Sequence, residues 1–192
     1  EPVITLAAAD GKSITIAGCD GHDVFVRKTG IYTMRTQLRI IASTLGYIEL
    51  EDPWIQLDLY RSDVITTKFT SGNLIGSTLG RISNGFPPHF VHVLGASSLP
   101  EPVNIIGNVI GSTSPQGAAT LRTVQIDRAV EYHIENNFMV SVHGTLLGSP
   151  FSQYGVQVGA CTVLNNTFYN SGTPDQLTAM LMYSGATIDI KN

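Results

Sequence analysis

The chain has 192 residues, a formal net charge of −4 at pH 7 and 14% charged residues, whereas about 25% is usual for globular proteins. Its Lys and Arg residues are scattered, which excludes a basic arm of the kind that packages nucleic acid. No apolar run reaches the roughly 18 residues that a spanning helix needs, so we expect no membrane span. These properties favour one domain over residues 1–192, and the low charge also suits extensive subunit contacts.

Short β-rich runs, separated by Gly, Pro, Asn and Ser, follow one another along the whole chain. No alternation of strands with helices and no internal repeat is evident, which argues against a parallel α/β fold. We therefore predict an all-β jelly-roll β-sandwich of about ten antiparallel strands. The expected strands cover residues 13–17, 23–26, 30–41, 54–61, 64–69, 89–94, 103–110, 121–126, 138–146, 154–168, 177–183 and 186–190.

The strand expected over residues 30–41 alternates between an apolar and a polar face. Such alternation is typical of a half-buried strand in an antiparallel sheet. It predicts that Tyr32, Met34 and Leu38 point into the sandwich, while Thr33 and Arg35 lie on the opposite face.

The same stretch carries a resemblance to a known family. An aromatic lead-in over residues 24–26, a short break, and then Gly30-Ile31-Tyr32 opening a long strand resemble the jelly-roll heads of the tumour-necrosis-factor ligands and of the complement recognition component. The runs 137–145 and 176–183 are similar to the late strands of those heads. Met34 stands where that family has another aromatic residue. The resemblance implies a homotrimer, possessing no enzymatic activity, that attaches to or recognises a partner.

Two classes of function are compatible with such a module. The first is a trimeric attachment or recognition head at a virion surface or in the extracellular space, with a protein or glycan receptor. The alternative is a structural capsid subunit of a small virus or particle, since jelly rolls serve both purposes. A head stays a discrete trimer in solution, whereas a shell subunit forms larger closed particles. A hydrolase or lyase has no positive signal, since no Gly-x-Ser-x-Gly elbow or phosphate-binding loop occurs.

We expect no catalytic residues, no metal site and no cofactor. The segment 20–23, Asp-Gly-His-Asp, has calcium-ligand chemistry, but too few oxygens lie nearby, and a solvated turn is the simpler interpretation. His89 and His92 are three residues apart, which places them on opposite faces of a strand. Cys19 and Cys161 either pair or remain free thiols. Asn165 begins the glycosylation triplet Asn-Asn-Thr.

The candidate binding residues are aromatic side chains beside Pro, Gly or Asn. Exposed aromatic rings stack on sugars or anchor protein partners; the alternative is that these rings fill the ends of the sandwich. The low net charge favours stacking and hydrogen bonding over salt-sensitive contacts. The candidates are Trp54, Phe86, Phe90, Phe151 and Tyr154.

Overall fold

The computed structural model describes residues 3–8, 11–28, 34–50, 52–80, 89–95, 102–111, 122–127, 131–141, 149–153, 161–170, 180–182 and 188–191, which form strands and turns and no helix. Within these ranges, no helix is long and apolar enough to cross a membrane. The strands are β1 (Val3–Ala8), β2 (Ser13–Ala17), β3 (Asp20–Lys28), β4 (Thr36–Ile41), β5 (Thr44–Glu49), β6 (Ile55–Tyr60), β7 (Asp63–Phe69), β8 (Ser71–Ile75), β9 (Thr78–Leu79), β10 (His89–Val93), β11 (Pro102–Ile106), β12 (Val109–Gly111), β13 (Arg122–Ile126), β14 (Glu131–Glu135), β15 (Phe138–Ser141), β16 (Ser149–Gln153), β17 (Cys161–Leu164), β18 (Thr167–Asn170), β19 (Met180–Met182) and β20 (Ile188–Lys191).

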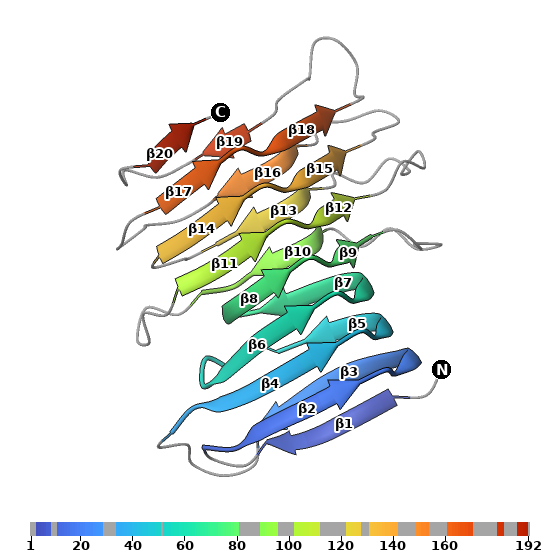
Figure 1. Ribbon diagram of the computed structural model, residues 1–192. Helices are drawn as coiled ribbons and strands as arrows, with labels where there is room; N and C mark the ends of the chain where they lie inside the picture. Colours follow the sequence, from blue (N-terminus) through green and yellow to red (C-terminus); the bar gives the residue numbers. More distant parts are fainter. Residues whose placement is uncertain are drawn as a thin grey trace.

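The strands stack as the coils of a parallel β-helix (Figure 1). One wall is an eight-stranded sheet in the order β2-β4-β6-β8-β11-β14-β17-β20. The other wall is a twelve-stranded sheet that forks at β7. The start of β7 pairs with β9, through Asp63 and Val64, and its end pairs with β10, through Thr67 to Phe69. Among the strands that the structure describes, the early coils therefore have two each and the later ones have three.

Aliphatic side chains fill the interior in rows that run from coil to coil. In the eight-stranded sheet, successive strands place one inward-facing residue each in register. Each fully buried aliphatic side chain contributes about 1.5–3 kcal/mol relative to exposure, so the row is a main source of stability. Its members, all at most 8% exposed, are Ile16, Ile40, Leu59, Leu74, Ile105, Ile134 and Val163.

The corner that follows each strand of this sheet turns on a single residue with positive φ. This left-handed conformation suits Gly best and Asn next. The residues at this position have φ between 47° and 66°; they are Gly18, Ala42, Arg61, Gly76, Gly107, Asn136 and Asn165.

The next residue in each coil belongs to a ladder of side-chain hydrogen bonds, the corner ladder. The backbone N–H of each ladder residue donates to the side-chain oxygen of the ladder residue one coil further on, at 2.9–3.2 Å. The sequence separations of these bonds, 24, 19, 15, 31, 29 and 29 residues, give the length of each coil. At each corner, the ladder thus provides a hydrogen-bond acceptor for a backbone N–H group that does not take part in strand pairing. The ladder comprises Cys19, Ser43, Ser62, Ser77, Asn108, Asn137 and Asn166.

The expected antiparallel jelly roll is wrong, because every strand pair in the described residues is parallel. A half-buried antiparallel strand and a β-helix strand share the same alternation of faces, so the pattern predicted strands without predicting their partners. Turn residues also have a role different from the expected one. Asp20 and Gly21 lie within β3, and the glycines at the corners turn the chain into a further wall of the same coil.

The predicted faces of the opening strand are partly confirmed. Leu38 is buried, with Thr36 and Ile40 on the same face of β4. The placement of Met34 is wrong, because this side chain is 59% exposed and precedes β4. Tyr32 and Thr33 lie outside the described residues.

The structure separates the two cysteines. Cys19 follows β2 and is free, whereas Cys161 begins β17, six strands along the same sheet. At about 4.8 Å per strand they are roughly 30 Å apart, far beyond the reach of a disulfide. We expect that reductant leaves the thermal unfolding temperature of the chain unchanged, and that mass spectrometry after alkylation under denaturing, non-reducing conditions finds two modified thiols per chain. A single intrachain bridge in that measurement would contradict the coil order.

Candidate functional site

Two rows of polar side chains run along the outside of the helix, one on each wall. The first row, on the eight-stranded sheet, is bonded to itself. Gln37 Nε2 and Asn73 Nδ2 both donate to the carboxylate of Asp58, and Asn104 Nδ2 donates to Asn73 Oδ1 at 2.7 Å. Asp58 is only 1% exposed. This row is a structural support whose central carboxylate is closed to solvent.

Two further ionisable groups, in or just before the strands of this sheet, have shifted pKa values. Burial and the adjacent Asp58 carboxylate raise the pKa of Tyr60, and the Arg39 guanidinium opposes them. Burial lowers the pKa of Arg35.

The second row lies on the forked sheet and is accessible. We call it the axial row; its members are Glu49 at the end of β5, Lys68 on β7, His92 on β10, Gln125 on β13 and Asp127 just after β13. Strand register places Glu49, Lys68, His92 and Gln125 on four successive strands. Their neighbours along each strand point inward and are buried, so the row faces outward.

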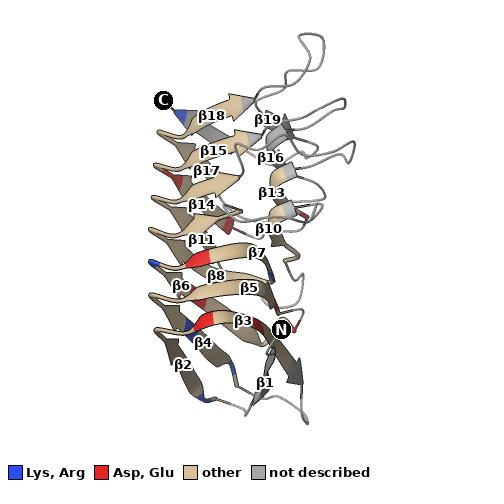
Figure 2. Cartoon of the chain, turned by 90° about the vertical axis from the view of Figure 1, so that its right-hand side faces the viewer, with Lys and Arg blue, Asp and Glu red and all other residues tan. Residues whose placement is uncertain are grey.

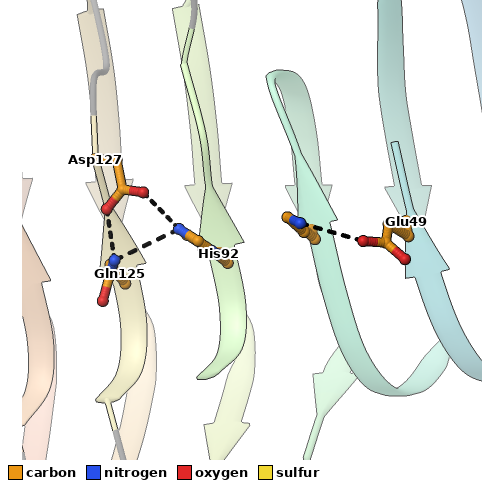
Figure 3. A network of polar contacts seen from close by, with 5 residues as sticks. Glu49, His92, Gln125 and Asp127 are labelled. Atoms are coloured by element: carbon orange, nitrogen blue, oxygen red, sulfur yellow. Dashed lines mark hydrogen bonds and ion pairs between the residues drawn. The ribbon is translucent and has the colours of Figure 1, made fainter. Parts of the chain in front are cut away.

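Two carboxylate–base pairs hold the axial row in place (Figure 3). Lys68 Nζ lies 3.1 Å from Glu49 Oε1, with side chains 32% and 41% exposed. His92 Nε2 lies 2.7 Å from Asp127 Oδ2, with side chains 17% and 34% exposed. Gln125 Nε2 donates to Asp127 Oδ1 and lies 3.4 Å from His92 Nε2. The carboxylates orient the two bases while all four side chains keep part of their surface in solvent.

The axial row offers both donors and acceptors. Lys68 supplies donors, the two carboxylates supply acceptors, and the imidazole and the amide supply both. Lys68 is paired with Glu49, and Asp127 accepts a hydrogen bond from Gln125 within the row, so the row has no excess of positive charge with which to bind a strongly anionic ligand. Among the described residues, no group of three or more His, Cys, Asp and Glu side chains could hold a metal ion.

The aromatic candidates from the sequence are spread along the molecule. Trp54 lies in the turn before β6, is half-buried and packs against the core. Phe90 on β10 is 2% exposed, which favours the alternative that this ring fills the interior. Phe151 lies on β16, where its backbone is in register with Val124, and its side chain is outside the described set. Phe86 and Tyr154 lie outside the described residues.

Sequence reasoning overlooked the axial row for a definite reason. Successive strands of the row belong to different coils, so up to 35 residues separate directly bonded side chains. A signal was present in the corners instead. The segments 41–46, Ile-Ala-Ser-Thr-Leu-Gly, and 75–80, Ile-Gly-Ser-Thr-Leu-Gly, differ at one position. The two segments occupy equivalent corners two coils apart, at Ser43 and Ser77, and aligning them would have indicated a repeating architecture.

No family model, curated protein or solved structure matches the chain. The class of protein therefore comes from the fold alone: a parallel β-helix with an accessible polar row along one wall.

Proposed function

We propose that the chain is a non-enzymatic attachment or recognition module that assembles as a homotrimer and binds an extended, neutral glycan along the axial row. The observation that carries this proposal is the accessibility of Glu49, Lys68, His92 and Asp127 on adjacent strands of a rigid wall. An extracellular or virion-surface location suits that role.

The two outer rows support the choice of wall. On the eight-stranded sheet, the Asp58 carboxylate is buried and engaged by two amides. A ligand there would have to break existing bonds to reach it, at a cost of about 1–3 kcal/mol for each buried group left unpaired. In the axial row, the ion-paired side chains on either side of the buried Gln125 are partly exposed, so sugar hydroxyl groups can replace the water around them directly.

Spacing and charge favour a glycan. Parallel strands repeat about every 4.8 Å, and an extended polysaccharide advances by a similar length with each sugar ring. Successive rings of a chain lying along the helix axis would therefore meet successive members of the row. A row without an excess of positive charge favours uncharged hydroxyl groups over acidic groups, and binding should change little with salt because few ions are released.

The test compares two histidine variants, His92→Ala and His133→Ala. His133 is a matched control, because it also bonds a carboxylate, with Nε2 3.0 Å from Glu131 Oε1, yet it lies on β14 of the other wall. The probe is a printed panel of neutral and acidic glycans, followed by calorimetry with the strongest binder. We expect His92→Ala to weaken neutral-glycan binding about tenfold, and His133→Ala to leave it unchanged.

Three results would contradict the proposal. One is the absence of binding to any glycan on the panel by the folded protein. Another is equal loss of binding in both variants. The third is binding restricted to acidic glycans and weakened steeply by salt, which would indicate an electrostatic site instead of the axial row.

A further inference from the structure

One corner of the β-helix combines exposed apolar side chains with few charged ones. Five large hydrophobic residues are exposed within the described part of the chain, and three of them, Val109, Phe138 and Tyr169, lie on β12, β15 and β18, at 48%, 42% and 52% exposure. β15 pairs with both β12 and β18, with Val109 in register with Phe138 and Tyr169 in register with Val140. The exposed residues thus gather on one surface.

The opposite flank of the same corner is also apolar. Ile75, Ile106 and Leu164 end β8, β11 and β17, face outward and are partly exposed. Gly76, Gly107, Asn136 and Asn165 form the ridge between the two flanks. We call the ridge together with its flanks the corner patch.

Charge is almost absent from the corner patch. The sequences of β12, β15 and β18 contain no charged residue, and β15 and β18 are tan along their described length in Figure 2. Glu135 interrupts the other flank and accepts a hydrogen bond from Asn136 at 3.2 Å. Two basic residues border the patch at its ends, where Lys191 is in register with Leu164 and Arg61 lies beside Gly76. A protein of net charge −4 repels its own copies, and an uncharged surface is where two copies can meet with least repulsion.

We propose that the corner patch is the surface through which copies of this chain associate. This inference rests on the self-assembly in the proposed function and adds the residues that perform it. A convex ridge with different apolar flanks allows the Phe138 flank of one copy to contact the Ile106 flank of the next. Such a heterologous contact closes into a ring when the rotation permits, and the proposed homotrimer is a ring of this kind.

Other occupants fit the patch less well. Anionic membranes attract apolar surfaces that are accompanied by Lys and Arg, and the strands of the corner patch carry neither. A glycan requires polar partners, which this surface supplies only at the ridge. A second copy needs apolar area and no opposing charge, as the patch provides.

The experiment places a charge in the patch and measures mass in solution. Phe138→Glu and Phe138→Lys are made in the full chain, with Tyr47→Glu and Tyr47→Lys as matched controls, because Tyr47 is another exposed aromatic residue, on β5. Sedimentation velocity over a range of concentrations gives the dissociation constant of the oligomer. We expect both Phe138 variants to raise it at least ~30-fold, while the Tyr47 variants retain the wild-type value.

The outcomes separate the inference from the proposed function. If wild-type protein is a monomer, self-assembly and the patch both fail. If it is an oligomer that the Phe138 variants do not weaken, or that the Tyr47 variants weaken equally, the patch is wrong and assembly stands. Circular dichroism identifies unfolded variants, and Val109→Glu, on the neighbouring strand, replaces any that do not fold. Wild-type binding to lipid vesicles that Phe138→Glu abolishes would contradict a homotypic role.

Discussion

Replacing Gly72 with alanine should prevent stable folding. Gly72 lies on β8 with φ of 132°, and a Cβ atom there would lie 1.9 Å from the carbonyl oxygen of Leu57 on the neighbouring coil. The backbones of Leu57 and Gly72 cannot move apart without breaking the pairing of β6 with β8. We expect the free energy of unfolding to fall by more than roughly 4 kcal/mol, a loss that is typical only of severe backbone or core defects. Urea denaturation measures this loss if the variant is soluble. If the variant does not fold at all, it will be expressed as insoluble protein.

A matched glycine substitution provides the control. Gly107 also has positive φ, at 66°, but a Cβ atom added there would meet no other group within 4 Å. Asn136 and Asn165 occupy the equivalent corner positions in the next coils. Gly107→Asn should therefore leave stability within about 1 kcal/mol of wild type. Equal stability of the Gly72 and Gly107 variants would show that the close approach of the coils is misplaced.

Replacing Asn137 with alanine should strongly destabilise the chain by breaking the corner ladder. Its Oδ1 accepts from the N–H of Asn108 at 2.9 Å, and its Nδ2 donates to the carbonyl of Ile105 at 2.7 Å. Alanine leaves both of these buried backbone groups without that partner, at about 1–3 kcal/mol each. We expect a loss of roughly 3–5 kcal/mol in the free energy of unfolding, including the cavity.

The neighbouring residue is the control for the ladder. Asn136 is exposed, with φ of 56°, and turns the corner without joining the ladder. Asn136→Gly should be neutral or change stability by only a few tenths of a kcal/mol, since Gly accepts this conformation readily. The two adjacent substitutions thus separate the ladder from the turn in one denaturation series. A larger loss for Asn136→Gly than for Asn137→Ala would contradict the assigned roles.

Local patterns in the sequence were sufficient to locate many strands. The alternation around Leu38 and the runs over residues 64–69 and 121–126 correspond closely to β4, β7 and β13. Alternation reflects only which side chains are buried, and a parallel coil buries alternate residues as an antiparallel sheet does. Choosing between these folds required the spacing of the corner residues, which varies from 15 to 31 residues in the first coils and is therefore difficult to detect.

The candidate site was less accessible to sequence reasoning than the fold. Aromatic residues beside Pro and Gly drew attention to Trp54 and Phe90, and the structure packs the first against the core and buries the second. Lys68 and His92 have no distinctive local context. They become a site only when parallel register places them side by side, a long-range property that a single sequence without a recognised repeat does not display.

The central claim, that a glycan lies along the axial row, is tested most directly by NMR of the histidine rings. In protein labelled at histidine, the imidazole signals are assigned by single substitution and followed while the strongest-binding neutral oligosaccharide is added. We predict that the His92 signal shifts with a saturating dependence on sugar, while the His133 signal on the opposite wall stays in place. A shift of His133 with His92 unchanged, or no shift of either signal at saturating sugar, would contradict the account.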